Sequence, residues 1–143
     1  MSVYSVKAAL LRLFAPAVKR QMQQLVPEGP VRMGSTLLAY QDKDLYALGP
    51  HTDTPKKLVT GLFYLPRTDE DRHAGTSLYV SKDPTFTCKR GPHYAFDMFN
   101  RVGTIPYTRN RLFAFACSNT SFHGVERLRG LSEPRRLINL DLR

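Results

Sequence analysis

The chain has 143 residues, of which 42% are hydrophobic and 23% are charged, and its formal net charge is +9. This length corresponds to about one domain with a real core and excludes two catalytic units, so any active site must lie in that domain. The basic residues occur singly or in short pairs, which favours a solvated basic surface over a nucleic-acid interface. No apolar run is long enough to span a bilayer, and we expect no membrane partner.

Residues 1–27 are predicted to form an amphipathic helical brace. The segment contains basic residues and no acid, as organelle targeting segments do. Its apolar residues nevertheless recur every three or four positions, at Leu10, Phe14, Val18, Met22 and Leu25. This spacing is typical of a helix packed on a domain, which we favour over a targeting segment. Pro16 is expected either to kink the helix or to divide it into two pieces.

From residue 35 onwards the pattern changes to short β-type runs bounded by turn residues. Eight strands are predicted, at 35–40, 46–51, 58–65, 76–81, 101–105, 112–117, 121–128 and 135–142. Eight is the number of strands that a jelly roll needs. We therefore expect a mainly β protein that forms a single domain over residues 1–143, with a jelly-roll core in 35–143.

The segment 82–100 is predicted to be a long ordered loop, because it combines turn residues with the aromatic side chains of Phe86, Tyr94, Phe96 and Phe99. Loops of this length in a compact domain are often functional. His93 lies in this loop, where a structural histidine is favoured over one that contacts a substrate.

The cysteines favour a reducing compartment. Cys88 and Cys117 lie far apart in the sequence and form no CxxC pair. This spacing indicates neither a zinc knuckle nor a disulfide framework, so we expect a cytoplasmic location.

A metal site is indicated by His51, Asp53 and His123. His51 and Asp53 are two residues apart, and residues i and i+2 of an extended chain point to the same face. His123 provides a second imidazole on a later predicted strand. Two histidines and one carboxylate are the usual protein ligands of non-haem iron(II), because they leave adjacent coordination positions open. Zinc accepts the same ligands, so these residues by themselves leave the metal open.

Six motifs follow one another in a recognisable order: Leu-Ala-Tyr at 38–40, His-Thr-Asp at 51–53, a threonine-containing strand ending Tyr-Leu at 58–65, a glycine-led strand at 75–78, His-Gly-Val at 123–125 and a basic strand at 135–140. With these motifs, residues 35–143 resemble the prolyl-4-hydroxylase-like branch of the 2-oxoglutarate/iron(II) dioxygenase superfamily. The resemblance implies a double-stranded β-helix, or jelly roll. It also implies that His51, Asp53 and His123 hold catalytic iron(II), with 2-oxoglutarate and dioxygen as co-substrates.

The same resemblance assigns co-substrate-binding roles. Arg135 resembles the residue that binds the distal carboxylate of 2-oxoglutarate, a group that an arginine fork can bind with two hydrogen bonds. Arg136 is the alternative, and since neighbouring strand residues face opposite ways, only one of the two should enter the barrel; we favour Arg135. Tyr40 and Tyr64 resemble tyrosines that hydrogen-bond the co-substrate, with ordinary core or rim positions as the alternative. Thr60 shares a strand face with Tyr64 and is a further candidate.

Hydroxylation of an unidentified substrate, with release of succinate and carbon dioxide, is the activity that the resemblance implies. Asp53 argues against halogenation, because related halogenases have a small residue in its place. Lys89, Arg90 and Arg101 would suit an anionic small molecule, and a peptide is the other substrate class considered. Two alternatives stay open: a cupin-like jelly-roll protein that binds metal without oxygenase activity, and an oxygenase directed at nucleic acid, which only the net charge of +9 supports.

Overall fold

The computed structural model describes residues 3–25, 33–88 and 93–143. In these ranges the protein is mainly β, with helices only near the N-terminus apart from one short 3-10 helix. Within the same ranges, no helix has the length and apolar character needed to cross a membrane.

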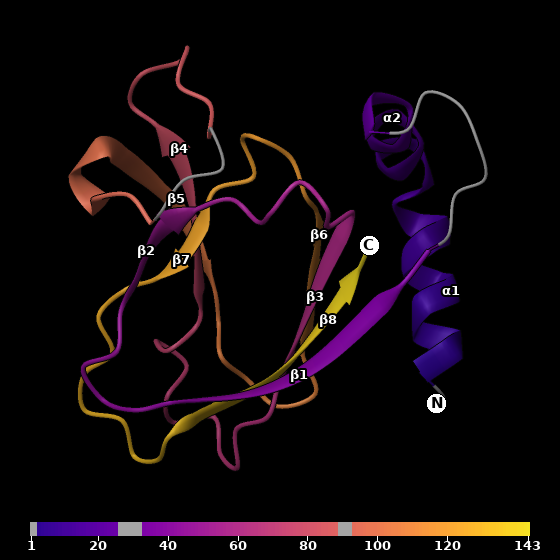
Figure 1. Cartoon of the computed structure of the whole chain (residues 1–143). Helices are drawn as coiled ribbons and strands as arrows, with labels where there is room; N and C mark the ends of the chain where they lie inside the picture. The colour runs from indigo at the N-terminus through magenta and orange to yellow at the C-terminus, as the bar shows by residue number, and fades with distance from the viewer. Residues whose placement is uncertain (1–2, 26–32, 89–92) are drawn as a thin grey trace.

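Eight strands form two antiparallel four-stranded sheets (Figure 1). Their bounds are β1 (Ser35–Asp42), β2 (Leu48–His51), β3 (Val59–Tyr64), β4 (Thr76–Ser81), β5 (Phe99–Ile105), β6 (Leu112–Ala116), β7 (His123–Val125) and β8 (Arg135–Leu142). The first sheet has the order β1-β8-β3-β6 and the second has the order β2-β7-β4-β5. Every predicted strand is present; β4 and β8 have the predicted bounds, β1 and β5 are longer, and the other four are shorter. The predicted mainly β fold with an N-terminal helical segment is confirmed.

The strand β8 lies inside the first sheet and is covered on both faces. Arg135, Leu137 and Asn139 line a cavity between the two sheets, whereas Leu140 and Leu142 pack against the helices on the opposite face. This alternation follows from the two-residue period of a strand. One face of β8 therefore carries residues of the candidate site, and the other face carries the leucines that pack in the core.

The N-terminal segment forms two helices, α1 (Val3–Leu13) and α2 (Ala15–Leu25), which cover the outer face of the first sheet (Figure 1). The helix divides at Phe14, and Pro16 lies in the first turn of α2, where its missing N–H removes no helical hydrogen bond. The predicted apolar stripe packs on the sheet through Leu10, Phe14, Val18 and Met22. Residues 1–2 and 26–27, and the side chain of Leu25, lie outside the described part of the chain.

The segment 82–100 packs through its aromatic side chains at one end of the second sheet. It includes the 3-10 helix η1 (Phe96–Met98), and its last two residues already belong to β5. The ring of Phe86 stacks on the ring of Phe122 with centroids 5.8 Å apart. The backbone N–H of Tyr94 donates to a carbonyl oxygen of β2 at 2.9 Å. The backbone at Tyr94 is therefore tied to the strand that carries His51.

Candidate metal centre

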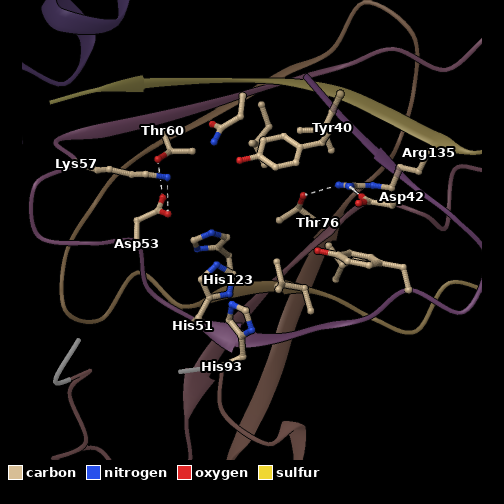
Figure 2. Close-up of a pocket in the computed structure, with 17 residues that line it drawn as sticks. Tyr40, Asp42, His51, Asp53, Lys57, Thr60, Thr76, His93, His123 and Arg135 are labelled. Atoms are coloured by element: carbon tan, nitrogen blue, oxygen red, sulfur yellow. Dashed lines mark hydrogen bonds and ion pairs between the residues drawn. The ribbon is translucent and has the colours of Figure 1, made fainter. Parts of the chain in front are cut away.

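A cavity of about 390 Å³ lies between the two sheets (Figure 2). Both sheets contribute to its lining, together with His93 from the aromatic segment. The predicted site residues found in this lining are Tyr40, His51, Asp53, Thr60, His123 and Arg135. Six residues that are spread over nearly one hundred positions of the sequence therefore face one cavity.

The three predicted metal ligands lie together at one end of the cavity. The possible ligand atoms of His51, Asp53 and His123 all lie within 4.8 Å of one another. His51 ends β2 and His123 begins β7, and the two residues are directly paired in the ladder between these strands. Their ring centroids are 4.4 Å apart (Figure 2).

Gly124 allows β2 and β7 to approach this closely. A Cβ atom at position 124 would lie 2.5 Å from the carbonyl oxygen of Leu48 and 3.1 Å from that of Gly49. The first distance is too short for a Cβ atom and the second is tight, so a side chain at position 124 would require the backbone to shift. The Gly that follows His123 in the sequence is thus part of the construction of the site.

Each histidine is oriented by its own backbone. Nδ1 of His51 lies 3.0 Å from the carbonyl oxygen of Gly49, and Nδ1 of His123 lies 3.1 Å from that of Ser121. A carbonyl oxygen only accepts, so Nδ1 carries the proton in both rings and Nε2 keeps its lone pair. Such outer contacts typically fix the ring of a metal-binding histidine.

Among the described residues, Asp53 accepts from three side chains, of which the thiol of Cys117 is the most distant, at 3.7 Å from Oδ2. Nζ of Lys57 donates to Oδ1 at 2.9 Å, and the hydroxyl of Thr60 donates to Oδ2 at 2.6 Å (Figure 2). Lys57 also forms an ion pair with the buried Asp141 at 3.0 Å. The carboxylate of Asp53 is therefore fixed in orientation while its remaining lone pairs stay available.

The pKa values keep the three ligands in the protonation state that a metal requires. Burial, and after it the neighbouring His123, lower the pKa of His51 to about 4. Burial also lowers the pKa of His123. For Asp53, burial acts to raise the pKa, but His123, Thr60 and Lys57 outweigh it and hold the pKa below its ordinary value. At neutral pH the two imidazoles are therefore neutral and the carboxylate is charged, which are the ligating forms.

Arg135 lies inside the protein and Arg136 faces the other way. The side chain of Arg135 is 2% exposed. Its Nη1 donates to Asp42, and its Nε donates to the carbonyl oxygen of Ala74 at 2.7 Å. Nη1 of Arg136 instead donates to Glu133 at 2.7 Å, outside the cavity. Of the two alternatives left open by the sequence, only Arg135 lines the cavity.

Of the other residues predicted to bind the co-substrate, Tyr40 and Thr60 line the cavity and Tyr64 does not. Tyr40 lines the cavity and is 45% exposed, as a residue at the entrance would be. Tyr64 is a buried core residue whose hydroxyl donates to Thr76 at 2.7 Å, and it is not among the lining residues. It touches the site indirectly, since its ring centroid lies 5.6 Å from Cζ of Arg135. Thr60 lines the cavity, but its hydroxyl is used by Asp53.

Of the residues that the sequence offers for substrate contact, His93 lines the cavity and Arg101 does not. His93 is exposed at the edge of the cavity, and its ring centroid lies 4.7 Å from that of His51. Arg101 lies 3.9 Å from Glu126 in an exposed ion pair outside the cavity lining. Lys89 and Arg90 lie outside the described residues. His93 is therefore better placed to meet a substrate than the sequence indicates.

Five lining residues with polar side chains are missing from the sequence-based prediction: Asp42, Tyr46, Lys57, Thr76 and Asn139. Asp42 could have been suggested by its position two residues after Tyr40, on the same strand face. Lys57 and Asn139 carry no such local pattern. Asn139 is 7% exposed, and its Oδ1 has no hydrogen-bond partner among the described residues. A buried acceptor without a partner inside a cavity is typical of a site that holds a ligand or water.

The residues present fit a divalent metal ion and, with one reservation, an acid beside it. The metal end offers two Nε2 lone pairs and one carboxylate in close proximity. At the other end, the buried Arg135 is a suitable partner for a carboxylate. The reservation is Asp42, which already pairs with Arg135.

Comparison with known proteins does not identify a family. No protein-family profile matches the chain, and no curated protein is significantly similar to it. One similar solved structure is a chain from the disulfide-linked pili of Bacillus endospore appendages, with 12% identity, a TM-score of 0.35, and coverage of 78% of this chain and 85% of that chain. A similarity at this level says nothing about function, so any proposal about function must be argued from the candidate site.

Proposed function

We propose that the protein is a non-haem iron(II), 2-oxoglutarate-dependent oxygenase that hydroxylates a substrate still to be identified. The observation that carries the proposal is the convergence of His51, Asp53 and His123 at one end of a cavity whose other end contains a buried arginine. A site that only stores a structural metal has no need of such a cation. The zinc-binding, cupin-like alternative therefore has less support.

A double-stranded β-helix is the fold that we propose for the eight strands. In this fold the chain passes repeatedly between two facing antiparallel sheets. The sheet orders β1-β8-β3-β6 and β2-β7-β4-β5 have this character, because successive strands alternate between the sheets from β1 to β4 and again from β5 to β8. The ligands would then come from β2, the loop after it, and β7.

The roles of the residues follow from their positions. Bound iron(II) and 2-oxoglutarate would supply the chemistry, in which dioxygen and a C–H bond give an alcohol while 2-oxoglutarate gives succinate and carbon dioxide. His51, Asp53 and His123 would hold the ion from one side and leave the cavity side open. Arg135 would bind the distal carboxylate. Apolar side chains that exclude water from the cavity are Leu48, Leu62, Val125 and Leu137.

Anaerobic titration with iron(II) and 2-oxoglutarate tests the proposal. We expect a weak visible charge-transfer band in the wild type and its loss in His123→Ala. His73→Ala is the matched control, because His73 is exposed, lies outside the cavity lining, and its Nε2 lies 3.1 Å from the carbonyl oxygen of Arg129. Tight zinc binding without any band would favour the cupin-like alternative. A band that survives His123→Ala would contradict the ligand assignment.

The substrate would be identified by succinate release. The exposed lining residues Tyr40 and His93 mark the entrance of the cavity, where a substrate would meet the metal. Panels of anionic metabolites, peptides and nucleotides cover the classes that the sequence suggests. For nucleic acid, binding must also weaken steeply as salt is added.

A further inference from the structure

The guanidinium of Arg135 already has a carboxylate partner. Its Nη1 donates to Oδ2 of Asp42 at 2.5 Å, and the two side chains are 2% and 11% exposed. Asp42 lies directly opposite Arg135 in the ladder between β1 and β8, so strand register places the two side chains together. Both line the cavity that contains the three metal ligands (Figure 2).

The remaining contacts of Arg135 are with neutral groups. Nε donates to the carbonyl oxygen of Ala74 at 2.7 Å, and Nη2 donates to Oγ1 of Thr76 at 3.4 Å. A guanidinium has five N–H donors, so it can still donate to a further acceptor. Its positive charge, however, is already compensated by Asp42.

The charged residues that line the cavity indicate which of its two ends would attract an anion more strongly. Among the described lining residues, the acids Asp42 and Asp53 match the bases Lys57 and Arg135 in number. A divalent ion at the histidines would add two positive charges at one end. That end would attract an anion strongly, whereas the Arg135 end is close to neutral. A dianion would therefore be held mainly by its metal-binding end.

We propose that Asp42 is a specificity-determining residue of the co-substrate pocket, an internal carboxylate that competes with the distal carboxylate of 2-oxoglutarate for Arg135. The inference depends on the proposed function. The bound acid must either displace Asp42 from Nη1 or place a second carboxylate beside it, and both weaken binding. The wild-type pocket therefore discriminates little between 2-oxoglutarate and 2-oxopentanoate, an acid of the same chain length with an apolar end.

The test compares the wild type with Asp42→Asn, which keeps the size of the side chain and an acceptor oxygen but removes the charge. Calorimetry on the manganese(II)-loaded proteins measures the Kd of 2-oxoglutarate and of 2-oxopentanoate. We expect Asp42→Asn to bind 2-oxoglutarate about tenfold more tightly and 2-oxopentanoate within about twofold of the wild type. Asp44→Asn removes the same charge from an exposed position outside the cavity lining and should change neither Kd.

Weaker binding of 2-oxoglutarate by Asp42→Asn would overturn the inference, because Asp42 would then orient Arg135 and not compete for it. A thermal melt shows whether the variant folds. If the variant does not fold, the ratio of the two Kd values in the wild type tests the inference. A preference above about hundredfold for 2-oxoglutarate over 2-oxopentanoate would contradict competition by Asp42 for Arg135. These results leave the proposed function intact. If manganese binds but neither 2-oxo acid does, the proposed function fails and the inference fails with it.

Discussion

At the scale of single residues, Asp53 is the most constrained side chain of the candidate metal centre. The His-x-Asp spacing predicts Asp53 beside His51, because residues i and i+2 of an extended chain share a face. The sequence does not reveal that Thr60 and Lys57 both donate to it, at 2.6 and 2.9 Å. Thr60 is predicted to bind the co-substrate, and in the structure its hydroxyl donates to the candidate ligand Asp53. The local sequence determines which face of a strand a side chain occupies, but it does not determine which residue that side chain contacts there.

Thr60→Val is expected to weaken metal binding without removing a ligand. Thr60 is 2% exposed, so valine fills the same space but removes the hydroxyl that donates to Oδ2 of Asp53 at 2.6 Å. Among the described residues, only the thiol of Cys117, at 3.7 Å, would still donate to that oxygen. Loss of such an outer contact typically costs about 10–100-fold in metal affinity. Competition against a chelator measures this change. Thr104→Val, which removes a hydrogen bond to Ser77 in the second sheet, should leave metal affinity unchanged; an equal loss there would mean that the effect is only on stability.

At the scale of the elements, the contact between β2 and β7 brings together the two histidines of the candidate metal centre. Both strands are short, with four and three residues, so few hydrogen bonds hold them together. Their register nevertheless pairs His51 with His123. A register change of one residue would turn one of these side chains away from the cavity. Close approach at Gly124 therefore determines both the position and the orientation of the ligands.

Gly124→Ala is expected to separate β2 from β7. Its Cβ would lie 2.5 Å from the carbonyl oxygen of Leu48, and backbone atoms cannot rotate away as a side chain can. We expect the protein to lose about 1–3 kcal/mol of unfolding free energy and to bind metal more weakly. Chemical denaturation and metal titration measure the two effects. Gly103→Ala in β5 is the control, because a Cβ there meets no atom within 4 Å; similar losses in both variants would argue against the close-approach explanation.

At the scale of the whole molecule, the cavity between the sheets couples stability to pH. Its lining includes the half-buried His51 and the buried His123, whose pKa values burial lowers so that both are neutral at pH 7. The unfolded chain takes up protons at these histidines at a higher pH than the folded protein does. Acidification therefore favours unfolding wherever the unfolded state binds more protons.

The metal-free protein is expected to lose stability as the pH falls from about 6.5 to 4. The pKa of His51 is lowered from 6.5 to about 4 on folding, so its contribution is present above 6.5 and lost through that window. The shift corresponds to about 3 kcal/mol at most. Urea denaturation at several pH values measures it, and His51→Gln should flatten the profile. A wild-type stability that stays constant from pH 7 to 4 would show that the histidines are solvated in the folded protein.

The sequence by itself predicts the approximate positions of the eight strands and the three candidate metal ligands, because strand periodicity and the His-x-Asp spacing are local properties. The tertiary structure decides the rest of the cavity. The partners Asp42 and Arg135 are separated by 93 positions, and only the pairing of β1 with β8 brings them together. The orphan acceptor of Asn139 likewise depends on which layers cover β8. Pairing between distant strands is set by the packing of the whole chain, and no short segment encodes it.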